Sequence, residues 1–220
     1  MKKITGLIPV KGNSERVTDK NLRSFGRSSL FELKLEQLSH TNCFHSIVVS
    51  SEDARIRDVA KANGFHTHNR DPKYSTSDVP MSSVYSYIAS EVDGDHIAWI
   101  NVTNPLAGPE CYTAAVQKYQ ELDAQFDCLL SVTESREYMF FDDKPVNFFP
   151  NPWPKSQDLK GLYEMNFVIN ILKNRDMVEW GSCVGSSPYF YVLDRVSAWD
   201  IDFPEDFEFC EMIYNSRLKS

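Results

Sequence analysis

The amino-acid sequence predicts an α/β fold in which a mainly parallel β-sheet lies between two layers of helices. Short apolar runs alternate with amphipathic segments over residues 4–133, in the order strand, helix, strand, helix. This alternation is typical of parallel sheets, because each strand returns to the sheet through a covering helix. With 220 residues, 42% of them hydrophobic, the chain can build one α/β domain with its own core. We therefore expect a single domain over residues 1–220.

The first part of the chain is expected to form strands and helices in turn. Apolar runs indicate the strands. The helices are indicated by apolar residues three and four positions apart, by Asp53 as an N-cap, by Gly64 as a stop signal and by Pro80 and Pro109 as openers. The expected strands are 4–10, 44–50, 96–102 and 127–133, and the expected helices are 29–39, 53–63, 80–92 and 109–122.

The alternation stops at about Ser135. Residues 138–162 contain Phe140-Phe141, Phe148-Phe149, Trp153 and four prolines. The segment is too aromatic for a flexible linker and too rich in proline for a helix, so we expect an arm that packs against another surface. The segments expected after it are regular structure at 165–172, a short helix near 175–180, a strand at 189–193 and a closing helix from Glu205.

Composition argues against several classes of partner. The net charge of −8 and the pI of about 5.1 do not fit a nucleic-acid-binding protein, which usually carries a basic face. No apolar run approaches the roughly 18 residues of a membrane helix, and we see no cleavable signal peptide. The five cysteines are scattered and include no C-x-x-C pair, so reduced thiols are expected. These observations predict a cytoplasmic protein.

Polar side chains follow the first strand, where ligands of open parallel sheets bind. This loop reads Lys11-Gly12-Asn13-Ser14-Glu15-Arg16 and is followed by Lys20-Asn21. The backbone N–H groups of a loop of small residues can hold phosphate oxygens, and the basic side chains add positive charge. The loop is neither a Walker A loop nor a G-x-G-x-x-G loop. On composition alone, a phosphate site and an ordinary solvated loop remain equal alternatives.

Two aspartates near the end of the chain form a second candidate site. Asp200 and Asp202 are two positions apart, so on an extended segment their carboxylates point the same way. Mg²⁺ takes one or two carboxylates together with substrate phosphates and water. The alternative is that these acids, like Asp206, only stabilise the start of the last helix. Spacing alone slightly favours this second role.

Taken together and in order, five segments resemble the CMP-sialic acid synthetases and related CMP-acid-sugar synthetases. No single segment is specific, but their order spans nearly the whole chain. The segments are Ile8-Pro9-Val10-Lys11-Gly12-Asn13-Ser14 with Lys20-Asn21, Val49-Ser50-Ser51-Glu52-Asp53, Asn69-Arg70-Asp71-Pro72 with Ser77-Asp78, Asn101-Val102-Thr103-Asn104-Pro105-Leu106, and Asp200-Ile201-Asp202 with Asp206-Phe207.

The resemblance implies a three-layer, Rossmann-like nucleotidyltransferase fold and a homodimer formed through an arm at about 138–162. It implies transfer of CMP from CTP to the anomeric hydroxyl of an acidic, sialic-acid-like sugar, with release of pyrophosphate and with Mg²⁺ as cofactor. The residues it assigns are Lys11, Lys20, Asp200 and Asp202 for catalysis, the two aspartates also binding the metal; Lys11, Gly12, Asn13, Ser14, Arg16, Lys20, Asn21, Arg70 and Ser82 for the nucleotide; and Asn101, Thr103, Glu164 and Asn166 for the sugar.

Four positions depart from the family pattern. Lys11 stands where arginine is usual, Glu15 where lysine is common, Asn101 where glutamine is usual and Ala107 where arginine is usual. The last two lie on the sugar side, so sialic, legionaminic, pseudaminic and octulosonic acids all stay open as acceptors. Two other functions also stay open. One is a nucleotidyltransferase for another base or a sugar phosphate, and the other is a non-catalytic nucleotide-binding module, against which the pair Asp200 and Asp202 argues.

Overall fold

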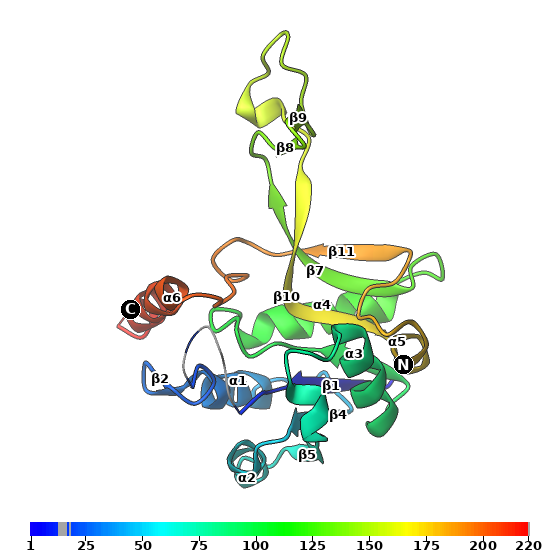
Figure 1. Ribbon diagram of the computed structural model, residues 1–220, viewed down its shortest axis with the longest axis vertical. Coiled ribbons are helices and arrows are strands. Elements are labelled where there is room, and N and C mark those ends of the chain that lie inside the picture. Colours follow the sequence, from blue (N-terminus) through cyan, green and yellow to red (C-terminus); the bar gives the residue numbers. More distant parts are fainter. Residues whose placement is uncertain (13–16, 18, 220) are drawn as a thin grey trace.

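The computed structural model describes residues 1–12, 17 and 19–219 and contains a seven-stranded sheet (Figure 1). Its strands are β1 (Ile4–Pro9), β4 (Ser46–Ser51), β5 (His66–Asn69), β6 (His96–Trp99), β7 (Cys128–Ser135), β10 (Leu162–Lys173) and β11 (Pro188–Val192). They lie in the order β11-β7-β10-β6-β1-β4-β5. Among these strands, β10 alone is antiparallel to its neighbours, while β1 is parallel to both β4 and β6. The expected α/β fold with a mainly parallel sheet is confirmed.

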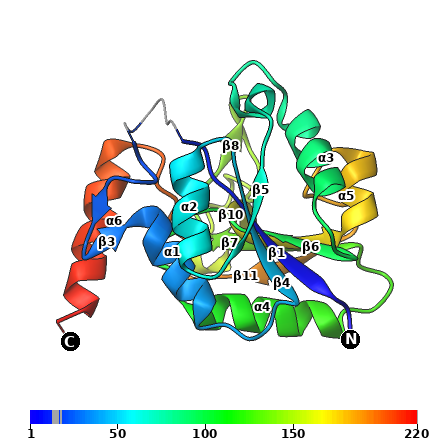
Figure 2. The same cartoon turned by 90° about the horizontal axis from the view of Figure 1, so that it is seen from below.

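Helices cover both faces of the sheet, as Figure 2 shows from below. The buried residues of α1 (Leu30–Ser39), α2 (Ala54–Ala62), α4 (Pro109–Glu121) and α6 (Pro204–Arg217) belong to one core cluster. Those of α3 (Met81–Glu91) and α5 (Asn174–Trp180) belong to a second cluster. Alternate residues of a strand face opposite sides, so Ile4 and Ile8 of β1 join the first cluster and Leu7 joins the second.

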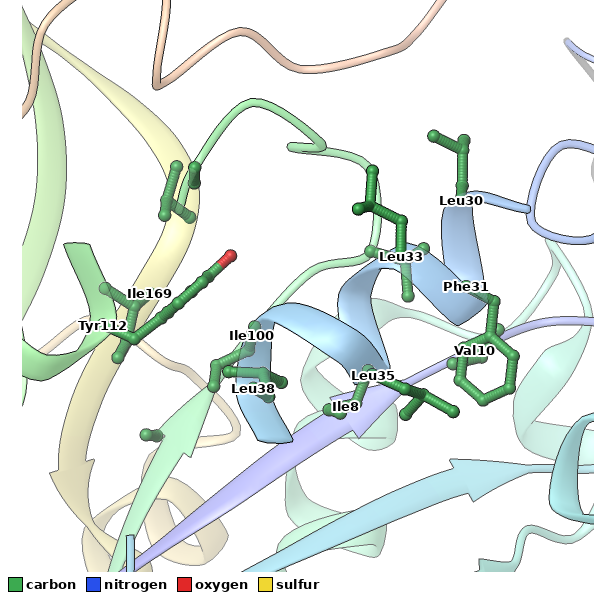
Figure 3. Packing of buried hydrophobic residues seen from close by; sticks show 14 of the residues in the cluster. Ile8, Val10, Leu30, Phe31, Leu33, Leu35, Leu38, Ile100, Tyr112 and Ile169 are labelled. Carbon is green, nitrogen blue, oxygen red and sulfur yellow. The ribbon is translucent and has the colours of Figure 1, made fainter. Parts of the chain in front are cut away.

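The larger cluster joins α1 to the middle of the sheet. Figure 3 shows Leu35 and Leu38 of α1 turned toward Ile8 and Ile100, and all four side chains are at most 1% exposed. A buried leucine or isoleucine stabilises a fold by about 1.5–3 kcal/mol relative to an exposed one. This contact therefore fixes the strand ends from which the cleft is built.

Asp53, Gly64 and Pro109 mark helix ends as expected, and Ser29 provides a cap that was not predicted. Ser29 is the N-cap of α1 and forms a capping box with Glu32, and Asp53 is the N-cap of α2. Gly64 follows α2 with φ +82°, a conformation that residues with a Cβ rarely adopt. Pro109 opens α4, but Pro80 is the N-cap of α3 and not its first helical residue.

The arm projects from the body of the molecule between β7 and β10 (Figure 1). Its Asn147 is 7% exposed and holds the two sides together, because Nδ2 donates to the backbone oxygens of Glu137 and Lys160 and Oδ1 accepts from the N–H of Met139. The short elements within it are β8 (Phe140–Phe141), β9 (Lys144–Pro145) and η2 (Ser156–Asp158).

Several elements were not expected from the sequence. Strand β5 reads His-Thr-His-Asn, without an apolar run, because it is the edge strand beside β4 and is only partly covered. Strand β10 is longer than the predicted segment 165–172 and carries a bulge between Met165 and Asn170. The remaining short elements are β2 (Ser24–Phe25), β3 (Ser28–Ser29) and η1 (Pro72–Ser75). In the part of the chain that the structure describes, no helix is long and apolar enough to cross a membrane.

Candidate active site

A cleft of about 780 Å³ opens at the carboxyl ends of β1 and β6. One part of its wall is polar and comes from the first loop, from the segment after β5 and from the loop before α6. Another part is apolar and comes from α3, β6 and β10. Of the expected site residues, those that line this cleft are Lys11, Lys20, Asn21, Arg70, Asn101, Thr103, Asp200 and Asp202. Asn13, Ser14 and Arg16, which were expected to bind the nucleotide, lie outside the described residues.

Hydrogen bonds hold the two lysine residues at the polar end. The Asn21 side chain donates from Nδ2 to the backbone oxygen of Lys11, at 2.9 Å. Lys20 is 8% exposed, and its Nζ donates to the backbone oxygen of Ile201, at 2.6 Å. The first loop is thereby joined to the segment that carries the two aspartates, although they are far apart in the sequence.

Gly12, whose N–H group was expected to hold a phosphate, does not line the cleft. That N–H donates to Oε1 of Glu52, at 2.8 Å. A Cβ at position 12 would lie 2.6 Å from Oδ2 of Asp53, so only glycine lets the loop pass this close to the start of α2. In the described part of the first loop, Gly12 therefore has a structural role.

A partly buried ion pair joins the first loop to the segment after β5. Arg70 is 2% exposed, and its guanidinium donates to Oε2 of Glu52, at 2.8 Å, and to the backbone oxygen of Val10. Burial alone would raise the pKa of the Glu52 carboxyl, but hydrogen bonds from Ser75 and Gly12 and the charge of Arg70 lower it. Glu52 is thus ionised at neutral pH and fixes the guanidinium at the cleft wall. The Nε atom of Arg70 is buried and has no hydrogen-bond partner among the described residues.

The loop with Asp200 and Asp202 is fixed from two sides. The Ile201 N–H donates to the backbone oxygen of Thr103, at 2.9 Å, next to the end of β6. Asp206 accepts the N–H groups of Asp202 and Phe203 at Oδ2 and the indole N–H of Trp199 at Oδ1. Phe203 is the N-cap of α6, so Asp206, and not Asp202, stabilises the first turn of this helix. The Asp200 and Asp202 side chains line the cleft instead.

Asn104 connects this loop to β10 and to α1. Its side chain is fully buried, and Nδ2 lies 3.1 Å from the Asn166 oxygen, 3.2 Å from the Ala198 oxygen and 3.3 Å from the Trp199 oxygen. Its own backbone oxygen accepts from Nζ of Lys34, at 2.9 Å. Lys34 is also fully buried and donates to the Tyr112 hydroxyl, and burial lowers the pKa of its ammonium to about 7.

The apolar wall is aromatic. Trp99 of β6 and Tyr85 of α3 pack with their ring centroids 4.5 Å apart, and Phe167 of β10 also lines the cleft. Nε1 of Trp99 donates to Oδ1 of Asn101, at 3.2 Å. Because an indole N–H can only donate, this contact orients the Asn101 amide with its oxygen toward Trp99.

Three further residues that were expected to contact a ligand do not line the cleft. Ser82 lies outside the cleft because Met81, Val84 and Tyr85 form the inward face of α3, while Ser82 lines a shallow groove beside Gly181. Glu164 is exposed and pairs with Thr133 where β10 runs into the arm. Asn166 is buried under the bulge, where its side chain bonds to Thr133 and to the Val168 N–H.

Three residues that organise the site had no assigned role from the sequence. Glu52 follows a strand and has the charge opposite to that of Arg70, which is a signal that could have paired them. No such signal was present for Asn104 and Lys34, because the hydrogen bond between them joins positions 70 residues apart in the sequence.

The family comparison decides the class of protein. A family model described as cytidylyltransferase matches residues 5–218. The chain is a member of the cytidylyltransferase family.

Curated relatives of this cytidylyltransferase have acid-sugar names. It is 25% identical to a pseudaminic acid cytidylyltransferase of Campylobacter jejuni, over 97% of each chain. It is 24% identical to N-acylneuraminate cytidylyltransferase A of Danio rerio, covering 94% of this chain and 50% of that protein. It is 23% identical to a CMP-N,N'-diacetyllegionaminic acid synthase of Legionella pneumophila, over 96% of each chain.

Solved structures support the fold. A CMP:2-keto-3-deoxy-manno-octonic acid synthetase complexed with CTP superposes on the cytidylyltransferase with a TM-score of 0.72 at 12% identity, covering 98% of this chain and 99% of that one. A 4-diphosphocytidyl-2C-methyl-D-erythritol synthase from Anaerococcus prevotii gives a TM-score of 0.68 at 13% identity, covering 100% and 97%. The expected nucleotidyltransferase fold is thereby confirmed.

Proposed function

We propose that this cytidylyltransferase transfers CMP from CTP to the anomeric hydroxyl of an acidic sugar and releases pyrophosphate. The family match and the acid-sugar names of the curated relatives support the reaction class. The observation that carries the proposal is the cleft, where Lys11, Lys20 and Arg70 meet Asp200 and Asp202. Such a cleft suits a substrate with several phosphates, since cations can hold the anion and carboxylates can bind a metal counter-ion.

We assign the two halves of the cleft to two substrates from the order of the strands. Arg70 and the segment 75–77 follow β5, on one side of β1, and we assign this half to the nucleoside. The residues after β6 and the bulge of β10 lie on the other side of β1, and we assign this half to the sugar. The loop of Asp200 lies between the halves, because Lys20 holds it on one side and Thr103 on the other.

Mg²⁺ fits the carboxylates that face the cleft. The described residues contain no group of three or more His, Cys, Asp or Glu side chains that could form a complete metal cage. Asp200 and Asp202 supply two carboxylates, and Mg²⁺ commonly binds one or two of these together with substrate phosphates and water. When bound, the ion would polarise the phosphate oxygens and offset negative charge on the leaving group.

The protein's own residues contribute mainly positioning and charge. Lys11 and Lys20 would hold the triphosphate, and Asn21 keeps the Lys11 backbone in place. Arg70 and Asn21, which line the cleft, would contact the nucleoside. Asn101 and Thr103 would place the anomeric hydroxyl against the α-phosphate. The new bond then forms between this oxygen and the α-phosphorus as the bond to pyrophosphate breaks, and the proton of the hydroxyl passes to water.

We also propose that the arm mediates a homodimer. Phe140, Phe141, Phe149 and Trp153 are 59%, 73%, 83% and 61% exposed. Such a cluster on a projecting arm is typical of an interface, and a two-fold dimer is the commonest closed arrangement.

The test is pyrophosphate release in the presence of CTP, Mg²⁺ and a panel of acidic sugars. Release should require both CTP and one of these sugars. Release with a sugar phosphate or with another nucleotide in place of CTP would assign the chain to a different nucleotidyltransferase reaction. CTP binding without release with any acceptor would identify a binding module.

A further inference from the structure

The Glu52 carboxylate accepts hydrogen bonds from two segments that border the cleft. Its Oε1 accepts from the backbone N–H of Gly12, in the first loop, at 2.8 Å. Its Oε2 accepts from the guanidinium of Arg70, at 2.8 Å, and from the hydroxyl of Ser75, at 2.7 Å. One oxygen therefore serves the segment after β1 and the other serves the segment after β5, so a single side chain joins the two.

Strand β4 places this carboxylate between the two segments. It lies between β1 and β5 in the sheet and ends at Ser51, so Glu52 stands where the segments after β1 and β5 begin. The Val10 N–H donates to the backbone oxygen of Ser50, at 2.9 Å, and the Arg70 N–H donates to that of Ser51, at 3.2 Å. Backbone hydrogen bonds thus hold both segments against the end of β4, beside Glu52.

Glu52 lies behind the wall of the cleft. Lys11, which precedes Gly12, lines the cleft, as do Arg70 and Ser75, whereas Glu52 does not. The carboxyl is ionised at neutral pH because hydrogen bonds and the charge of Arg70 lower its pKa against the effect of burial. Both of its oxygens are then acceptors, so it can hold the two segments at the same time.

We propose that Glu52 is a positioning residue for the nucleotide and that it sets the separation of Lys11 from Arg70 and Ser75 across the cleft. The inference rests on the proposed function, in which Lys11 holds the triphosphate and Arg70 contacts the nucleoside. CTP would contact both segments at once, so its affinity would depend on their separation as well as on each contact. A ligand that occupies one half alone would not be sensitive to this separation.

Two variants break the link between the segments. Glutamine has the same length but one acceptor oxygen, so in Glu52→Gln the N–H₂ group must face either the donor of Gly12 or those of Arg70 and Ser75. Glu52→Asp keeps both oxygens on a side chain that is one methylene shorter and cannot reach both segments. The Glu52 side chain is 20% exposed, so water can reach a donor that is left unpaired, and both variants should fold.

The experiment measures dissociation constants by calorimetry, at a fixed concentration of free Mg²⁺, for CTP, CMP and inorganic triphosphate. CMP occupies the nucleoside half and triphosphate the half of the first loop, whereas CTP spans both. In both variants the Kd of CTP should rise about tenfold or more, while the Kd values of CMP and triphosphate should each change less than about threefold. The loss of affinity for CTP should therefore exceed the product of the losses for the two fragments.

Asp176→Asn is the matched control. Asp176 is 8% exposed, its Oδ1 accepts from Nε of Arg175, at 3.1 Å, and it does not line the cleft. Like Glu52→Gln, this variant removes a carboxylate from an ion pair with an arginine. It should leave all three Kd values unchanged, and the unfolding midpoint of each variant is measured alongside.

A loss of affinity for CTP no larger than the product for the two fragments, in a folded variant, would overturn the inference. Glu52 would then act on one half of the cleft or on stability alone, while the proposed function would stand because the wild type still binds CTP. Loss of folding in both variants would also overturn the inference, since Glu52 would then serve the fold. If the wild type does not bind CTP, the proposed function fails and the inference fails with it.

Discussion

Nζ of Lys34, in the middle of α1, donates a hydrogen bond to the backbone oxygen of Asn104, 2.9 Å away, at the turn after β6. Both side chains are fully buried. Through Asn104 this contact reaches Ala198 and Trp199, which precede Asp200. The position of the carboxylates in the cleft therefore depends on a polar network inside the core.

Replacement of Asn104 by leucine should uncouple this network from the cleft. Leucine has the same branching at Cγ but cannot donate, so the oxygens of Asn166, Ala198 and Trp199 would lose their shared donor. Such a buried loss costs about 1–3 kcal/mol. We expect kcat to fall at least tenfold and the Mg²⁺ concentration for half-maximal rate to rise, because the loop of Asp200 loses one of the contacts that fix it. Steady-state kinetics at several Mg²⁺ concentrations would measure both effects.

Asn174→Leu is the matched control for this variant. The Asn174 side chain donates to the backbone oxygen of Val92, at 3.1 Å, and does not line the cleft. Loss of this hydrogen bond should lower the unfolding midpoint without changing the Mg²⁺ concentration needed for half-maximal rate. Equal losses of rate in both variants would mean that Asn104 acts only on stability.

Lys34 should make stability depend on pH. Burial lowers the pKa of its ammonium from 10.5 to about 7, so between these values the unfolded chain binds a proton that the folded chain does not. The free energy of unfolding should therefore rise with pH from 7 toward 10.5, with a limiting slope of about 1.36 kcal/mol per pH unit. Lys34→Met removes this group. Urea unfolding at pH 7, 8 and 9 should show the rise in the wild type and a flatter profile in Lys34→Met, and parallel profiles would show that Lys34 is protonated in the fold.

Replacing Asp202 and replacing Asp206, near the start of α6, should have different effects: the first on activity and the second on stability. Asp202→Asn keeps the shape of a residue that lines the cleft but removes a charged ligand, so turnover should fall by orders of magnitude with little change in the unfolding midpoint. Asp206 accepts three donors over its two oxygens, and asparagine offers a single acceptor oxygen. Asp206→Asn should therefore lower the unfolding midpoint. Pyrophosphate release and thermal unfolding of both variants measure the pattern, and near-normal turnover in Asp202→Asn would remove Asp202 from the site.

The exposed aromatic residues of the arm lead us to predict that the protein forms a dimer. Light scattering at micromolar concentration should give about twice the chain mass of 25.3 kDa. Replacing Phe141 and Phe149 together by serine should shift the protein toward the monomer, because both side chains are more than two-thirds exposed in the single chain. Met212→Ser changes an exposed apolar residue of α6 and should leave the mass unchanged. A monomeric wild type would refute the interface.

The sequence predicted those features that depend on local pattern. Periodicity located α1, α2 and α4, and loop composition after β1 pointed to Lys11 and Lys20, which line the cleft. The family resemblance assigned Ser82 to the nucleotide but says nothing about which face of a helix a residue occupies. In the structure, Ser82 lies on a face of α3 that does not line the cleft. The position of Phe167 in the cleft could not be predicted from the sequence, because it depends on a bulge in β10. That bulge is held by a hydrogen bond between Asn166 and Asn104, which is distant in the sequence. Lys34 likewise occupies a core position that its residue type alone disfavours.

The most direct test of the central claim follows the α-phosphorus of CTP. The protein is incubated with Mg²⁺, an acid sugar and CTP labelled at the α-phosphate, and in a parallel reaction with CTP labelled at the γ-phosphate. Transfer of CMP predicts that the α-label appears in a sugar conjugate and the γ-label in pyrophosphate, with equal amounts of both products. Release of the α-label as free CMP would show hydrolysis, and transfer of the γ-label to the sugar would show a kinase; either result would contradict the assignment.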